Sequence, residues 1–97
     1  MFPGPRYIRL GPHSGEEFRQ NILIPAIEQN REIVINLDGT FGYGSSFLEE
    51  AFGGLVRKGI DKDIIIYIRD NLISNDDPTY ITEIKEYIDD ALKEENK

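Results

Sequence analysis

The chain has 97 residues and no cysteine, and its 18 acidic side chains against 11 basic ones give a net charge of −7. This length suffices for one compact domain, over residues 1–97 with a core at about 6–92, and the lack of cysteine excludes disulfides, thiol catalysis and thiolate-bound zinc. The acidic balance disfavours nucleic acid and anionic membranes as partners, because both are negatively charged.

The N-terminal part of the chain predicts a short strand followed by a helix. Tyr7–Leu10 alternates weakly between apolar and basic residues, which is typical of a short strand near a sheet edge. Ser14 and Glu17 have the spacing of a capping box, so a helix is expected to follow. Pro25 lies inside that helix and lacks a backbone donor, so we expect it to bend or interrupt the helix one turn earlier.

The middle of the chain predicts a buried strand and a second helix. Glu32–Leu37 is a nearly continuous run of β-branched residues, as in a central parallel strand. Ser46 and Glu49 form a second capping-box pattern ahead of an amphipathic helix. That helix contains Gly53-Gly54, which costs on the order of 1 kcal/mol per glycine relative to alanine and therefore indicates close approach of the helix to the sheet.

The C-terminal part repeats the pattern of a strand followed by a helix. Ile64–Ile68 reads as another buried strand, and Asp77-Pro78 gives a capping acid followed by a first-turn proline. A clear amphipathic helix follows. The order β-α-β-α-β-α predicts an α/β fold with a small, mainly parallel β-sheet.

Nothing in the sequence indicates a membrane span or a secretion signal. No window approaches the roughly 18 apolar residues that a span requires. The first residues, Met1–Arg6, lack the apolar core of a signal peptide. We therefore expect a cytoplasmic protein.

The most informative segment is the connection from the strand at Ile33–Leu37 to the next helix. It carries three glycines and two serines, and ligands and partners of an open α/β sheet are met at such strand-to-helix turns. The start of a helix also presents unpaired N–H groups, which suit an anion or a phosphorylated hydroxyl. The expected contact residues are Phe41, Gly42, Tyr43, Gly44, Ser45 and Phe47, with Ser45 and Ser46 as candidate phosphoacceptors.

This segment also carries a family resemblance. The string Gly44–Leu55, with Gly15–Arg19 and the strand Ile33–Leu37 in the same order, resembles the STAS-like domains of unknown function found in bacteria. The resemblance covers roughly residues 6–92 and implies a STAS-like fold. These domains resemble, more distantly, the anti-sigma-factor antagonists, whose serine at this turn is phosphorylated by a histidine-kinase-like ATPase that they bind.

The resemblance places Ser45 at the position of the phosphorylated serine and matches Leu48 to the leucine of the antagonists' motif. Gly44 stands where the antagonists have aspartate, and Phe47 stands where they have glycine. Both departures concern the proposed switch, so the resemblance implies the fold and the place of the site more directly than it implies phosphorylation.

The sequence gives less support to nucleotide hydrolysis, metal binding or acid–base catalysis. Gly39 and Gly44 have the spacing of a phosphate-binding loop, but Ser45 stands where that loop needs lysine, which disfavours an NTPase. Asp38 ends one predicted strand, and Asp70 and Asp76 or Asp77 come from the connection after the next one. Three such acids near one sheet edge could converge to hold Mg²⁺, although solvated turn acids and a helix cap explain them as well. His13, the only histidine, fits an exposed turn better than a general base.

The leading hypothesis is a non-enzymatic regulatory domain without a cofactor. It would bind a protein partner, such as a histidine-kinase-like ATPase, and phosphorylation of a serine would switch that binding. The alternative is a sensor for a small anion or nucleotide held by the same N–H groups, and a third reading is a metal-assisted hydrolase using Asp38 and Asp70.

Overall fold

The molecule is built almost entirely of helices. The computed structural model describes residues 3–39 and 42–95. Helices account for 63% of these residues and strand for 2%, without a sheet. The expected α/β fold with a small parallel sheet is therefore wrong for the described chain.

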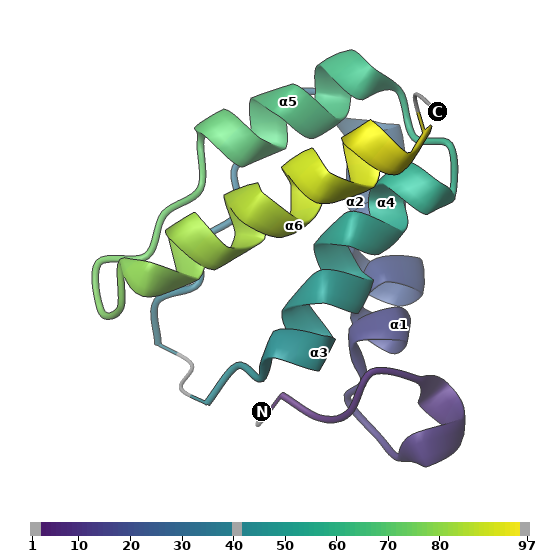
Figure 1. Ribbon diagram of the computed structural model, residues 1–97, viewed down its shortest axis with the longest axis vertical. Coiled ribbons are helices and arrows are strands. Elements are labelled where there is room, and N and C mark those ends of the chain that lie inside the picture. Colours follow the sequence, from purple (N-terminus) through teal and green to yellow (C-terminus); the bar gives the residue numbers. More distant parts are fainter. Residues whose placement is uncertain (1–2, 40–41, 96–97) are drawn as a thin grey trace.

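Besides α6, the fold has two long helices, each of which is interrupted by a π-helical segment (Figure 1). The first consists of α1 (Gly15–Phe18), η2 (Arg19–Leu23) and α2 (Ile24–Gln29), and the second of α3 (Ser45–Leu48), η3 (Glu49–Gly53) and α4 (Gly54–Arg57). The 3₁₀ turn η1 (Ile8–Leu10) precedes them, and α5 (Lys62–Asp70) and α6 (Thr79–Glu95) follow.

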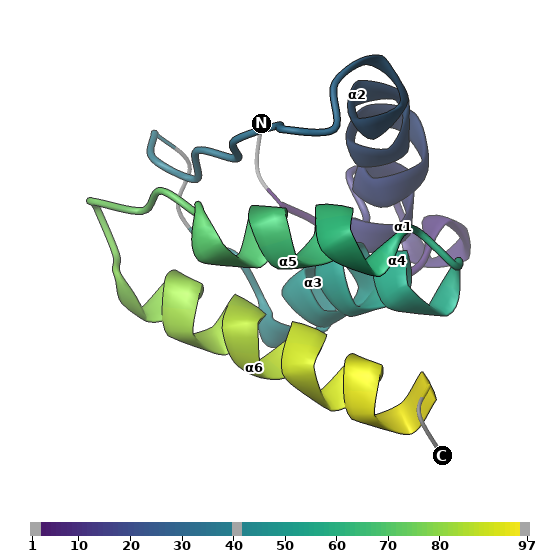
Figure 2. The same cartoon turned by 90° about the horizontal axis from the view of Figure 1, so that it is seen from above.

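The helix formed by α3, η3 and α4 is the centre of the packing. It contacts α1 and η2 on one side and α6 on the other, and Figure 2 shows these helices in successive layers. Its segment η3 buries Glu50 to Gly53. The apolar core includes Phe47, Leu48, Phe52 and Leu55 from this helix, with Ile65 and Ile68 from α5 and Ile84 and Ile88 from α6.

Two of the three expected strands are helical. Within the expected strand Tyr7–Leu10, residues Ile8–Leu10 form the turn η1, and Ile64–Ile68 lies inside α5. Asp61 caps α5 by accepting a hydrogen bond from the backbone N–H of Asp63, at an N···O distance of 2.9 Å. A five-residue apolar run cannot be assigned to strand or helix by periodicity alone, and here the cap and the burial of one helix face favour the helix.

The third expected strand is extended but forms only a fragment of a sheet. Asn36 makes an isolated parallel bridge to Ile73. Leu37 N–H donates to the carbonyl of Ile73 at 2.8 Å, and Ile73 N–H donates to the carbonyl of Ile35 at 3.0 Å. The chain therefore keeps the parallel pairing that crossover connections favour, but reduces it to one pair of short segments.

The expected interruption before Pro25 takes the form of a π-helical segment. Ile24 N–H donates to the carbonyl of Arg19, five residues back, in place of the usual four. Pro25 has no backbone N–H to donate, so the helical hydrogen bonds change in this turn from residues four apart to residues five apart. The helix continues past the proline to Gln29.

Candidate functional site

Two loops meet where the paired extended segments end. The carboxylate of Asp38 accepts hydrogen bonds from the backbone N–H of Asp76 at 2.8 Å and from the side chain of Asn75 at 3.0 Å. In return, the carboxylate of Asp76 accepts from the N–H of Gly39 at 2.9 Å. These reciprocal bonds hold the loop that leads to α3 against the loop that leads to α6.

The aromatic residues of the glycine-rich loop have different positions. Tyr43 is half-buried and packs edge-to-face on Tyr80, at the start of α6, with ring centroids 5.1 Å apart. Phe47 is 2% exposed and belongs to the core, so it cannot contact a partner without rearrangement. The expected contact at Phe41 lies outside the described residues, while Gly42 and Gly44 are exposed.

Ser45 and Ser46 are both exposed at the start of α3. The N-cap residue is Gly44, which has no side chain, so the capping role expected for Ser46 is wrong. Glu49, its expected partner, instead bonds to Arg6 and Arg57. Neither serine hydroxyl has a hydrogen-bond partner among residues 3–39 and 42–95, which leaves both available for modification or contact.

The loops of Asp38 and Asp76 are hydrogen-bonded to each other, but the expected metal ligands do not form a metal site in the part of the chain that the structure describes. The carboxylate of Asp70 lies 3.0 Å from the guanidinium of Arg69, and the oxygens of Asp38 accept from neighbouring donors. Within the described parts of the chain, no group of three or more histidine or acidic side chains could hold a metal ion. The reading as a hydrolase using Asp38 and Asp70 therefore has no geometric support.

A buried ion pair lies where the two long helices cross, and sequence reasoning missed it. The guanidinium of Arg19, on η2, donates to both the carboxylate and the backbone carbonyl of Glu50, on η3. The side chain of Arg19 is 3% exposed and that of Glu50 9%. Gly54 permits this crossing, because a Cβ there would lie 2.1 Å from Nη1 of Arg19.

More charged side chains extend this cluster towards the surface. Glu49 accepts from Arg57 at 2.8 and 3.0 Å and from Arg6 at 2.6 Å. The hydrogen bonds from Arg57 lower the pKa of Glu49, and Arg6 lowers it further, while burial opposes both. The close approach at Gly54 is to another helix, whereas the sequence had indicated approach to a sheet.

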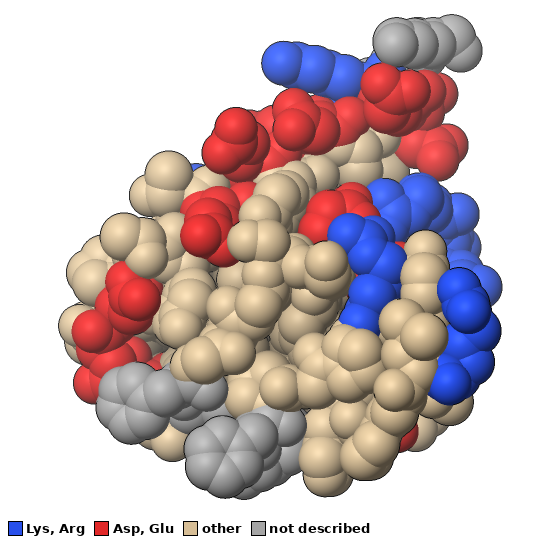
Figure 3. All heavy atoms as spheres, turned by 60° about the horizontal axis from the view of Figure 1, so that its bottom comes forward, with Lys and Arg blue, Asp and Glu red and all other residues tan. Residues whose placement is uncertain are grey.

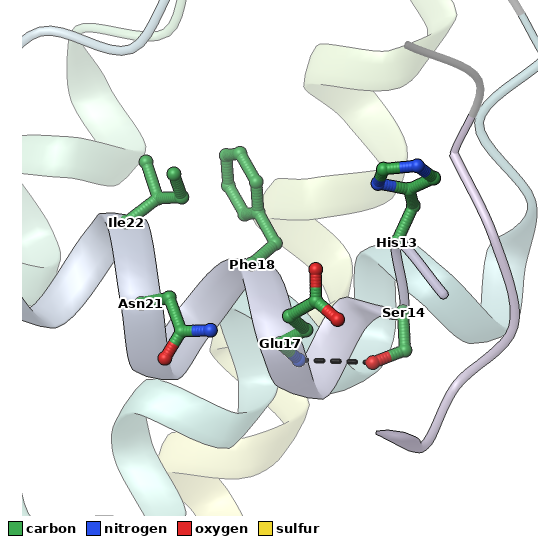
Figure 4. Close-up of a pocket in the computed structure, with 6 residues that line it drawn as sticks. All are labelled: His13, Ser14, Glu17, Phe18, Asn21 and Ile22. Carbon is green, nitrogen blue, oxygen red and sulfur yellow. Dashed lines mark hydrogen bonds between the residues drawn. The ribbon is translucent and has the colours of Figure 1, made fainter. Parts of the chain in front are cut away.

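A shallow pocket of about 100 Å³ lies along the first helix. Figure 4 shows His13, Phe18 and Ile22 in a row above the helix, and Ser14, Glu17 and Asn21 also line the pocket. The hydroxyl oxygen of Ser14 accepts from the N–H of Glu17 at 2.9 Å, which confirms the first half of the expected capping box. His13 is exposed and has a positive φ of 59°, so it is a turn residue as expected.

Charge is unevenly distributed over the surface. Figure 3 shows lysine and arginine side chains gathered at one side of the viewed face and acidic side chains elsewhere. Arg6 and Arg9 both lie against the ring of Tyr7, with Cζ 5.9 and 5.2 Å from its centroid. In contrast, the sequence has no lysine or arginine between Arg31 and Arg57, the stretch that contains both candidate serines.

Comparison with known families defines the class of the domain. Residues 14–77 match the family described as a STAS-like domain of unknown function (DUF4325), so the chain belongs to that family. Neither curated proteins nor solved structures gave a significant match. None of the described helices is long and apolar enough to cross a membrane.

Proposed function

We propose that this STAS-like domain is a regulatory, non-enzymatic interaction domain whose partner binds at the start of α3. The observation that carries the proposal is the exposure of Ser45 and Ser46, whose hydroxyls have no hydrogen-bond partner in the described structure. A serine at a helix start normally caps the helix. Here neither does, so neither is explained by the stability of the fold.

Phosphorylation of Ser45 would change binding more than folding. A phosphate brings about two negative charges, which the positive end of a helix tolerates. The loops that carry Asp38 and Asp76 contain no lysine or arginine that could pair with the added charge. A partner that contacts uncharged Ser45 is then repelled or loses its hydrogen bond. The resemblance to anti-sigma-factor antagonists supports an ATPase of the histidine-kinase-like type as this partner.

Affinity capture from the native host tests the proposal. The baits are the wild type, Ser45→Ala, Ser45→Asp and Thr82→Asp, which places the same charge at an exposed position of α6. We expect the wild type, Ser45→Ala and Thr82→Asp to retain one ATPase and Ser45→Asp to lose it. Intact mass of the wild-type bait then shows whether a phosphate is attached. Equal capture by all four baits would contradict the proposal.

The second candidate function is an anion sensor at the same place. The first N–H groups of a helix lack intrahelical acceptors, and Gly44 provides no capping side chain. A bound anion raises the melting temperature by mass action, so inorganic phosphate and nucleotides are the probes. Gly44→Asp supplies a capping carboxylate in open space, since no atom lies within 4 Å of a Cβ there. This variant should abolish the shift, and a wild type without a shift would exclude the sensor.

A further inference from the structure

The extended segment Ile33–Leu37 is hydrogen-bonded along one edge only. Its bonds to Ile73 use the N–H of Leu37 and the carbonyl of Ile35. Along a strand, alternate residues direct their backbone groups to opposite edges. The backbone groups of Val34 and Asn36 therefore face the other edge, and they have no hydrogen bond to any residue that the structure describes.

The side chains of this segment divide in the same way as those of a sheet strand. Ile33 and Ile35 pack against the core, and Leu37 is 3% exposed. Val34 points outward and is 50% exposed, although it is a large apolar side chain. In Figure 2 the segment runs along the upper rim of the drawing.

The open edge lacks the features that keep strand edges from pairing. Natural edges are protected by lysine, proline, bulges or covering elements. The sequence from Ile33 to Leu37 contains no charged residue and no proline, and three of its five residues are β-branched. Charged residues stand only at its two ends, with Glu32 before it and Asp38 after it. Such an edge favours pairing with another strand.

We propose that Ile33–Leu37 is the dimerisation edge of the domain and pairs with the same segment of a second copy. Two-fold symmetry makes this pairing antiparallel and satisfies both open edges at once. A two-stranded pair alone is marginal in water, whereas three or more strands with an apolar face are stable. In the dimer the two Ile33–Leu37 segments pair with each other, and each keeps its bridge to Ile73 along its outer edge.

Charge and apolar contact select the register of this pairing. With Val34 opposite Val34 of the second copy, the two exposed apolar side chains meet and Glu32 lies opposite the neutral Asn36. A register centred on Ile35 places Glu32 opposite Asp38, and like charges directly opposite each other destabilise a strand pair. A register centred on Asn36 places Val34 opposite Asp38 and leaves this apolar side chain without an apolar neighbour.

Light scattering coupled to size-exclusion chromatography tests the dimer, with loading concentrations from low to high micromolar. We expect the wild-type mass to rise with concentration towards twice 11.1 kDa. Val34→Lys places two ammonium groups opposite each other and should remain monomeric. Ile22→Lys is the matched control, because Ile22 is 57% exposed and lies on a helix. It should dimerise like the wild type.

Hydrogen exchange of the wild type tests the dimer without any variant, so the result stands even if Val34→Lys misfolds. In the wild type, exchange at the N–H groups of Val34 and Asn36 should slow as protein concentration rises, while exchange at exposed loop amides does not change. A wild type that stays monomeric, or a folded Val34→Lys that still dimerises, overturns the proposal. Serine modification plays no part in this interface, so failure of the dimer leaves the proposed function unaffected.

Discussion

The two long helices begin with the same sequence pattern and use it differently. Ser14 and Glu17 precede and open the first, and Ser46 and Glu49 have the same spacing in the second. Ser14 is completely buried and caps its helix, whereas Ser46 is exposed and does not. A capping box therefore identifies a helix start but does not show whether its serine is structural or available for contact.

The cause of the difference is where each helix begins. Ser14 is the N-cap residue of α1, whereas α3 begins at Ser45 and has Gly44 as its N-cap. Ser46 therefore lies inside the first turn, where its hydroxyl does not cap the helix. Glu49 lies beyond this turn and binds Arg57 and Arg6.

The largest expected effect comes from breaking the buried ion pair where the two long helices cross. Glu50→Ala leaves the guanidinium of Arg19 buried without its carboxylate, which typically costs about 3–5 kcal/mol. Arg31→Ala is the control, because Arg31 and Asp61 form an exposed pair worth at most about 1 kcal/mol. Urea unfolding of both variants measures the difference. Equal stabilities would mean that the crossing does not depend on the pair.

Part of this arrangement could be predicted from the sequence. The caps at Ser14 and Asp77, and the interruption before Pro25, were predicted from residues close together in the chain. The pairing of Arg19 with Glu50 spans 31 positions and depends on how two helices cross. Ile64–Ile68 was misassigned because a short apolar run fits either element, and packing against α6 decides between them.

The next largest loss of stability is expected at the contact between the starts of the two helices. A Cβ on Gly15 would lie 2.4 Å from the backbone carbonyl oxygen of Phe47, so Gly15→Ala forces the helices apart. We expect a loss of about 1–3 kcal/mol in the free energy of unfolding. Gly44→Ala is the matched control, since its Cβ would meet open space. A Gly15→Ala protein as stable as the control would contradict the close approach.

Replacing each serine by alanine tests directly whether Ser14 is structural and Ser46 is not. Ser14→Ala removes a cap and should cost about 1 kcal/mol, whereas Ser46→Ala should change stability by less than about 0.5 kcal/mol. Thermal or urea unfolding of the two variants under identical conditions measures both values. If Ser46→Ala were the more destabilising, the serine would be structural and the proposed contact role would lose its basis.

The smallest effect is a pH dependence carried by Glu49. Arg57 and Arg6 lower the pKa of Glu49 in the folded chain, so Glu49 contributes stability above its unfolded-chain pKa. That contribution is lost as the pH falls through the folded pKa, because the carboxylate must then take up a proton. Its side chain is 24% exposed and solvent screens the pair, so the contribution is at most about 1 kcal/mol.

Unfolding by urea over a series of acidic pH values measures this contribution. Glu49→Gln should flatten the acid side of the stability profile, and Glu28→Gln, at an exposed position of α2, should leave it unchanged. An acid profile that Glu49→Gln leaves unchanged would show that the arginines do not stabilise the ionised carboxylate.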